Sequence, residues 1–276
     1  MPYLLICVGQ VLTLTLDQND RDLSEFPSDI SSNTEILLLE FNSIASVPQK
    51  ALSGVTSLKY LQLSSNRLTE FPDLSEVAGT LTTLLLDKNQ IKNVKSEYIN
   101  VLTKLEILGL TENKILSLPD LSGVATKLSE LHLYWNQLEK FPHAHKRAKS
   151  LTMVGVNRNN LEDIKANHFQ MIANKKFSHI NMVGNSLKSL PVLCEFGPEF
   201  SMNLDQIPFV CDKKMAWILT DGVDVTFGSC EEPDHLRGRP LNSLSYADLG
   251  IHPGIFILFA RISFPLNNVF EYLVLG

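Results

Sequence analysis

The sequence lacks the short motifs that mark common catalytic and metal centres. It contains no G-x-x-x-x-G-K phosphate loop, no G-x-S-x-G nucleophile turn, no H-E-x-x-H pair and no C-x-x-C pair. The seven histidines are scattered, and no spacing of Cys and His fits a zinc site. These absences predict a protein with no catalytic residues, no bound metal and no cofactor, and therefore not an enzyme.

An excess of positive charge is also missing. The net charge is −6 and the pI is near 5.7, with acidic and basic residues interspersed. This balance argues against nucleic acid and anionic membrane as partners. One basic cluster, His143-Ala-His145-Lys146-Arg147, is interpreted as a solvated loop between two repeats, with a metal or polyanion site as the alternative.

Long uninterrupted apolar runs are absent at both ends of the chain. Residues 251–276 are strongly apolar, but Arg261 and Glu271 interrupt them before the roughly 20 residues of a spanning helix are reached. Membrane association is therefore not favoured over packing of this tail onto the rest of the chain. Met1 to Leu16 is apolar enough for a secretory signal, yet it has no Lys or Arg at its start and no clear cleavage site. An N-terminal strand is the alternative.

The sequence is rich instead in one repeated pattern. An asparagine recurs at intervals of 23 to 26 residues, each time within the same apolar frame. One copy reads Leu58-x-x-Leu61-x-Leu63-x-x-Asn66-x-Leu68. The two central leucines flank one residue, which is the spacing of a short strand with one buried face. The repeated asparagines are Asn42, Asn66, Asn89, Asn113, Asn136, Asn159 and Asn185.

The asparagines have a structural explanation. The chain must turn after each strand, which takes backbone N–H and C=O groups away from their sheet partners, and buried polar backbone has to be paired. An Asn side chain offers one acceptor and two donors. Stacked from coil to coil, the side chains from Asn42 to Asn185 are expected to satisfy these groups as a ladder.

This pattern resembles the leucine-rich repeat, whose period is 20 to 29 residues. The resemblance implies an α/β solenoid, a horseshoe with short parallel strands on the concave face and irregular, 3-10 or short helical segments on the convex face. We divide the chain into an N-terminal segment (1–22, a signal core or a degenerate coil), repeats (23–200), a C-terminal cap (201–250) and an apolar tail (251–276).

The segment after the repeats carries a second resemblance. Cys211-Asp212, followed by Cys230-x-x-Pro233-x-x-Leu236-x-Gly238, resembles the C-terminal flanking cap of extracellular leucine-rich repeat proteins. In that pattern the first and third cysteines pair, which implies a Cys211–Cys230 disulfide. The second and fourth are missing, with Ala216 and Leu249 near their places. The cap also implies a buried Trp217, while Cys7 and Cys194 stay unassigned.

Without a catalytic motif, the candidate site is a surface. Positions between and just beyond the core leucines point out of the concave sheet, and curved solenoids bind ligands there. The predicted ligand-binding residues are Phe41, Asp87, Glu112, His132, Tyr134, Trp135 and Arg158. His132, Tyr134 and Trp135 are prominent because aromatic side chains often anchor interfaces; ordinary surface is the alternative.

Three hypotheses of function follow. The first is a secreted or cell-surface protein, hence extracellular, that binds a protein ligand on its concave face. The second is a cytoplasmic scaffold or enzyme regulator with Cys211 and Cys230 reduced. The absence of an Asn-x-Ser/Thr glycosylation acceptor favours this second hypothesis, whereas the cap favours the first. The third is a fragment of a receptor ectodomain.

Overall fold

The computed structural model describes residues 3–8, 11–143, 150–165, 179–191, 200–219, 224–226 and 228–251, with side chains described from Leu14 onward except at Trp217, Asp224 and Thr226. The predictions made for the side chains of Cys7 and Trp217 lie outside the described residues, as do Cys194 and residues 252–276. So do His145, Lys146 and Arg147 of the basic cluster.

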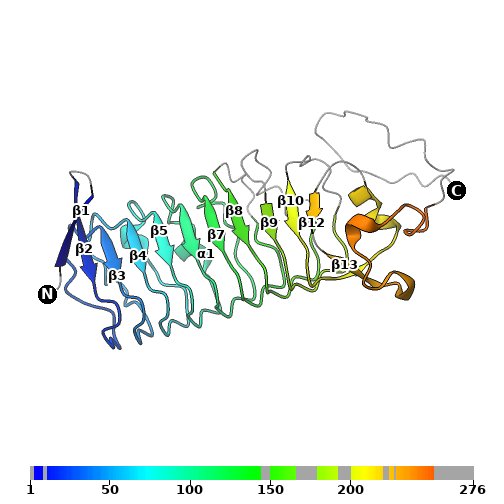
Figure 1. The fold of residues 1–276 in the computed structure, drawn as a ribbon. Coiled ribbons are helices and arrows are strands. Elements are labelled where there is room, and N and C mark those ends of the chain that lie inside the picture. Colours follow the sequence, from blue (N-terminus) through cyan, green and yellow to red (C-terminus); the bar gives the residue numbers. More distant parts are fainter. Residues whose placement is uncertain are drawn as a thin grey trace.

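The described chain winds as a solenoid whose strands follow one another in space in the order of the sequence (Figure 1). Eleven strands form the main sheet, in the order β1 to β10 and then β12. β1 and β2 form an antiparallel hairpin, and every later pairing in this sheet is parallel. The strands are β1 (Tyr3–Val8), β2 (Val11–Asp17), β3 (Ile36–Leu38), β4 (Tyr60–Gln62), β5 (Thr83–Leu85), β6 (Ile107–Gly109), β7 (Glu130–His132), β8 (Met153–Gly155), β9 (His179–Asn181), β10 (Ser201–Asn203) and β12 (Asp224–Thr226).

The interior of the solenoid is built from the repeated leucine positions. The central residue of each strand pairs with the same position of the next coil, for example Leu61 with Leu84 and Leu84 with Leu108. These three side chains are fully buried. Because each coil places its apolar side chains against those of its neighbours, the core is continuous along the solenoid. This confirms the strand phase that the spacing predicts.

The asparagine ladder is present as expected. The Asn136 side chain donates from Nδ2 to the carbonyl oxygen of Leu110 in the preceding coil (2.8 Å) and to that of Leu133 in its own coil (3.3 Å). Its Oδ1 accepts the N–H of Ile115 (3.0 Å). The same contacts recur at the other asparagines, which are 4% to 9% exposed.

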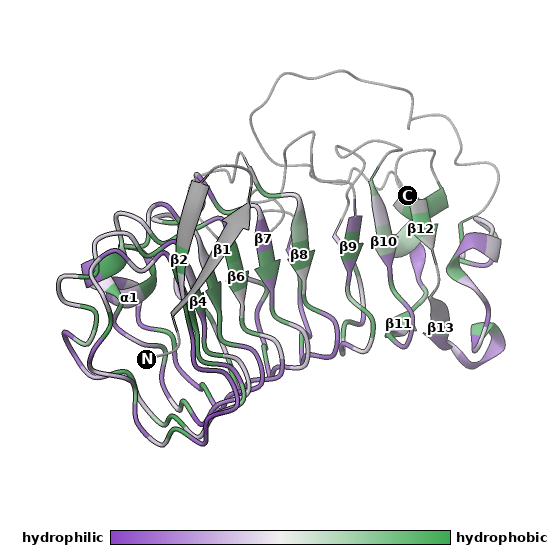
Figure 2. Ribbon diagram, turned by 60° about the vertical axis from the view of Figure 1, so that its left-hand side comes forward, coloured by the Kyte–Doolittle hydropathy of each residue, from purple (hydrophilic) through white to green (hydrophobic). Residues whose placement is uncertain are grey.

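The convex side carries irregular segments with short helical turns. These turns are η1 (Ser75–Val77) and α1 (Ser96–Ile99), and α1 lies on the opposite side of the coil from the sheet (Figure 2). At the C-terminal end a second, two-stranded sheet pairs β11 (Pro208–Val210) with β13 (Ser229–Glu232). Three further 3-10 turns accompany it, η4 (Lys213–Leu219), η5 (Asp234–Leu236) and η6 (Leu241–Ser243).

Candidate functional site

The concave sheet presents three rows of outward side chains, here called the inner rows. The entry row holds the first residue of each strand, and the centre row holds the third. The exit row holds the residue two positions after the centre row. Register aligns each row across the coils, so that Gly109, His132 and Gly155 lie side by side in the centre row of β6, β7 and β8. Asp87 and Tyr134 belong to the exit row.

A fourth row borders the concave face, and the sequence pattern did not reveal its special backbone. The residue just before each ladder asparagine has a positive φ, as Phe41 (56°), Glu112 (54°) and Trp135 (54°) show. We call this the rim row. A left-handed conformation costs a non-glycine residue roughly 1–2 kcal/mol, so its recurrence shows that the turn geometry demands it. The row comprises Phe41, Ser65, Lys88, Glu112, Trp135, Arg158 and Gly184.

The predicted ligand-binding residues therefore fall into two groups. Asp87, His132 and Tyr134 lie in the inner rows, whereas Phe41, Glu112, Trp135 and Arg158 lie in the rim row. The position relative to the ladder asparagine is the sequence signal that could have separated them. Phe41 belongs to the coil of β3, several coils away from Trp135, and the structure does not bring these two aromatic residues together.

Two glycines shape the centre of the concave face. A Cβ atom on Gly109 would lie 2.6 Å from Asp87 Oδ2, and one on Gly155 would lie 1.8 Å from Tyr134 Cε1. Both distances are too short for any side chain, so Asp87 and Tyr134 lean across the backbone of the next coil. Sequence analysis missed both glycines, although each one replaces a larger residue at a repeated outward position.

Asp87 is held in a partly buried position. Its Oδ1 accepts the Thr111 N–H at 2.6 Å, and its Oδ2 lies 3.4 Å from the Ser64 hydroxyl. Burial raises the pKa of Asp87 above its ordinary value, and the hydrogen bonds from Thr111 and the nearby His132 oppose that rise. The carboxylate is therefore partly desolvated, while it stays partly exposed on the concave face.

An aromatic cluster stands next to Asp87 along the sheet. The rings of His132 and Tyr134 are tilted against each other with centroids 5.7 Å apart, and His132 Nε2 lies 3.1 Å from Glu130 Oε2. The Tyr134 hydroxyl lies 3.7 Å from the sulfur of Met153, whose side chain is 42% exposed. Burial, followed by the charge of Glu130, raises the pKa of Tyr134, so this phenol stays neutral and can donate a hydrogen bond.

The rim row beside this cluster carries paired side chains. The Arg158 guanidinium lies over the Trp135 ring, 5.2 Å from its centroid. Trp135 is nevertheless 56% exposed, which is unusual for so large an apolar surface. One coil earlier, Lys88 Nζ lies 4.0 Å from Glu112 Oε1. Two contacting pairs thus border each other, with the half-buried His132 and Tyr134 in the inner rows, and the exposed Trp135 under Arg158 in the rim row.

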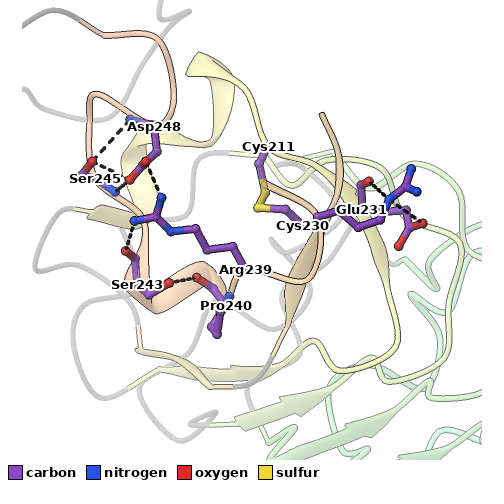
Figure 3. Close-up of a disulfide and its surroundings, with 9 residues drawn as sticks. Cys211, Cys230, Glu231, Arg239, Pro240, Ser243, Ser245 and Asp248 are labelled. Atoms are coloured by element: carbon purple, nitrogen blue, oxygen red, sulfur yellow. Dashed lines mark hydrogen bonds and ion pairs between the residues drawn. A yellow bond between two sulfur atoms is a disulfide. The ribbon is translucent and has the colours of Figure 1, made fainter. Parts of the chain in front are cut away.

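The predicted disulfide is present in the C-terminal cap. Cys211 and Cys230 are bonded, and both are buried (Figure 3). Elsewhere in the cap, Arg239 makes an ion pair with Asp248 at 2.5 Å, and Asp248 also accepts the N–H and the hydroxyl of Ser245 (Figure 3). Ala216 and Leu249, near the places of the missing cysteines, pack against the hydrophobic core.

The described residues contain neither a cluster of metal-ligating side chains nor a helix that could span a membrane. No group of three or more His, Cys, Asp or Glu side chains there could hold a metal ion, and His143 of the basic cluster lies 3.8 Å from Asp120. Within the same residues, no helix has the length and apolar character needed to cross a bilayer.

Comparisons with known proteins agree with this architecture. Residues 32–75 match the family model described as leucine rich repeat. A stretch of 54 residues is 39% identical to phospholipase A2 inhibitor beta of Elaphe climacophora, and it spans 20% of this chain but only 16% of that protein.

Solved structures extend the likeness to most of the chain. The octameric complex of Latrophilin 3, Unc5D and the leucine-rich repeat protein FLRT2 matches with a TM-score of 0.68 and 24% identity, over 79% of this chain and 69% of that one. The Drosophila Toll–Spatzle complex matches with a TM-score of 0.66 and 21% identity, over 78% of this chain and 32% of that one. The predicted fold, a leucine-rich repeat horseshoe with a disulfide-bonded C-terminal cap, is confirmed.

Proposed function

We propose that this chain is a non-enzymatic binding protein that acts outside the cell and recognises a protein ligand on its concave face. The binding surface is centred on β7, where His132 and Tyr134 lie between Gly109 and Gly155, and it continues onto Trp135 at the rim. The similar proteins support a protein as the ligand, because two of them are found in complexes with other proteins and one is an inhibitor of phospholipase A2.

The exposed aromatic cluster is the observation that carries the proposal. Tyr and Trp supply large, rigid contact surfaces at a low cost in side-chain entropy, and they are enriched at the centres of interfaces. Here Tyr134 is fixed across Gly155, and Trp135 is held by Arg158. Both side chains are therefore ordered before a ligand arrives, which reduces the entropy lost on binding.

The disulfide supports an extracellular site of action. Disulfides persist in oxidising compartments and are rare in the cytosol, and the cap closes around the Cys211–Cys230 bond. The cytoplasmic scaffold is the alternative. The two hypotheses are separated by comparing the mobility of protein from its native source on non-reducing and reducing gels. A Cys211–Cys230 disulfide in that protein supports secretion, and two free thiols contradict it.

A photocrosslinking residue tests the location of the ligand. Met153 and Val101 are matched positions, because both are exposed apolar residues (42% and 39%), one on the concave strand β8 and the other on the convex side after α1. With the crosslinker at Met153, a protein ligand in extracellular fluid or on cell surfaces of the source organism should be captured. Capture only at Val101 would contradict a concave site.

A double substitution measures the energetic weight of the aromatic cluster. Changing Tyr134→Ala together with Trp135→Ala should weaken binding of the captured ligand about thirtyfold, because truncating a buried aromatic anchor costs about 2 kcal/mol. The convex control, Lys95→Ala with Glu97→Ala, should leave the affinity within about twofold. Equal affinities of both variants would show that the ligand does not use this cluster.

A further inference from the structure

The inner rows of β3 to β10, all of which are described, contain no lysine or arginine. They carry four carboxylates, Glu40, Asp87, Glu130 and Asp205. The chain as a whole has 24 Lys and Arg against 30 Asp and Glu, and the inner rows depart from this near balance. Among the described residues, the lysines and arginines lie outside the inner rows, and the concave sheet itself is an acidic surface.

The basic residues of the rim row have partners of their own within that row. Two basic residues, Lys88 and Arg158, occupy the rim row between β3 and β10. Lys88 lies beside Glu112, another rim residue, and Arg158 lies over the ring of Trp135. Both side chains thus contact other residues of the rim row.

Apolar side chains share the concave face with Glu40 and Asp87. Ile36, Leu38, Leu85 and Ile107 occupy outward positions on β3 to β6 and remain partly exposed. Tyr60 lies among them, close enough to Glu40 and Asp87 that their charges, after burial itself, raise the pKa of its phenol. A carboxylate on such a surface attracts a cation more strongly than one in bulk water, because the local dielectric constant is lower.

We propose that the concave face of β3 to β7 binds a basic segment of the partner protein, one that carries Lys or Arg side chains among apolar residues, with Asp87 opposite a cation. The proposal rests on the proposed function and specifies the chemistry of the ligand. Charge complementarity of this kind raises association rates and excludes acidic competitors.

The geometry around Asp87 leaves room for such a contact. Since Gly109 has no side chain, the Asp87 carboxylate can lie over the backbone of the next coil, where it stays only partly buried. An ionised carboxylate has about four acceptor sites, and its contacts with the Thr111 N–H at Oδ1 and, at 3.4 Å, with the Ser64 hydroxyl at Oδ2 fill only two of them. Glu130, held by His132, stands farther along the same face and offers a second acidic contact for a neighbouring basic side chain.

Two synthetic peptides test the charge preference. They have the same length and the same apolar residues, and carry Lys at every polar position in one and Glu in the other. Fluorescence anisotropy with the whole oxidised protein should show binding of the lysine peptide, with an affinity that falls as salt is added, and at least tenfold weaker binding of the glutamate peptide. Comparable binding of both peptides, or no binding of the lysine peptide, would overturn the proposal.

Matched single substitutions locate the contact. Asp87→Asn and the convex control Glu97→Gln each remove one negative charge. The concave substitution should weaken binding of the lysine peptide about tenfold, and the convex one by less than twofold. If both variants lost the same affinity for the lysine peptide, the peptide would be attracted only by the net charge of the protein, and the proposal would fail.

The same variants separate this proposal from the proposed function. If the ligand captured at Met153 depends on Tyr134 and Trp135 but binds the Asp87→Asn protein unchanged, the concave site stands and the basic segment is ruled out. If the lysine peptide binds in an Asp87-dependent manner while no protein is captured at Met153, the charge preference stands and the proposed protein ligand fails.

Discussion

The repeats and the C-terminal cap bury their hydrophobic core by different means. Within the repeats, each coil is completed by the next one: the Leu110 carbonyl and the Ile115 N–H of one coil are both satisfied by Asn136 of the following coil. The last ladder asparagine is Asn185, and Ile207 occupies the equivalent place in the coil of β10. From there on, the chain uses a covalent bond between Cys211 and Cys230.

This difference has a physical reason. A coil inside a solenoid has a neighbour on each side that supplies hydrogen-bond partners and apolar contacts, so a repeated short pattern is sufficient. The terminal coil has no such neighbour, and its segments must be fixed to one another. The cap does this with the disulfide and with the contacts of Arg239 and Asp248.

The largest expected effect tests the interior of the repeats. Leu110 is fully buried, whereas Leu116 in the same coil is 48% exposed. Leu110→Asp should cost several kcal/mol, because it places a carboxylate in an apolar interior, and it should abolish a cooperative melting transition or lower it greatly. Leu116→Asp, the same chemical change, should shift the melting temperature little. Similar losses in both variants would show that the repeat phase is wrong.

A smaller effect tests the ladder itself. Asn136→Ala removes the partner of the buried Ile115 N–H, whereas the Leu110 carbonyl keeps its hydrogen bond from Asn113 Nδ2 (3.1 Å). One buried group left unpaired costs about 1–3 kcal/mol, so denaturant unfolding should show a loss of about that size. The control is Asn160→Ala, an exposed asparagine next to a ladder position; a comparable loss there would contradict a special role of the ladder.

The corresponding test of the cap removes its covalent bond. Closing a loop of about 20 residues stabilises a protein by roughly 3 kcal/mol on the chain-entropy estimate. Cys211→Ser with Cys230→Ser should lower stability by about that amount, and reducing agent should lower the wild type to a similar level while leaving the double variant unchanged. If the reducing agent destabilised the wild type and the double variant equally, its effect would not come from the Cys211–Cys230 bond.

The smallest effect compares one aspartate from each region across pH. The pKa of Asp87 is raised, chiefly by burial, whereas that of Asp248 is lowered, chiefly by its hydrogen bonds with Ser245. Because the pKa of Asp87 is raised in the folded state, ionisation of its carboxyl group weakens the fold. The stability that the protonated carboxyl group provides is therefore present at low pH and is lost as the pH rises through the folded pKa. The lowered pKa of Asp248 has the opposite sign: its stabilisation is present at neutral pH and lost as pH falls through the folded pKa.

Asparagine substitutions would resolve these two contributions. At neutral pH, Asp87→Asn should raise the melting temperature slightly and Asp248→Asn should lower it. Both differences should shrink as the pH is lowered, first for Asp87, whose pKa is raised, and last for Asp248, whose pKa is lowered. Melting curves recorded from about pH 3 to about pH 7 would reveal the signs. Shifts in the same direction at neutral pH would contradict the assigned causes.

Much of the fold follows from the sequence because the signal is repeated. The spacing assigns Leu61 and Leu63 to the core, where both are fully buried. The donors and the acceptor of its side chain assign Asn136 to the ladder. Both assignments are possible because each pattern occurs in many copies under the same constraint. The cap disulfide followed from the family resemblance of Cys211 and Cys230. The boundaries of the four segments stay predictions.

The candidate site was less accessible to sequence analysis, because it depends on departures from the repeat. Gly109 and Gly155 are unremarkable as single residues, and their effect appears only when register places them beside Asp87 and Tyr134. The left-handed backbone of the rim row could not be predicted from the sequence for a related reason. Its residues, Phe41, Trp135 and Arg158 among them, share no side-chain chemistry, since the constraint acts on the main chain.

The sequence by itself determined the period, the buried positions and the ladder, because these follow from local spacing and from the need to pair backbone groups in every coil. Only the tertiary structure decided which outward residues share one surface. Residues far apart in the sequence become neighbours through the stacking of coils, as Asp87 and Thr111 do at 2.6 Å. Both the aromatic cluster around Tyr134 and the acidic character of the concave face arise from this stacking.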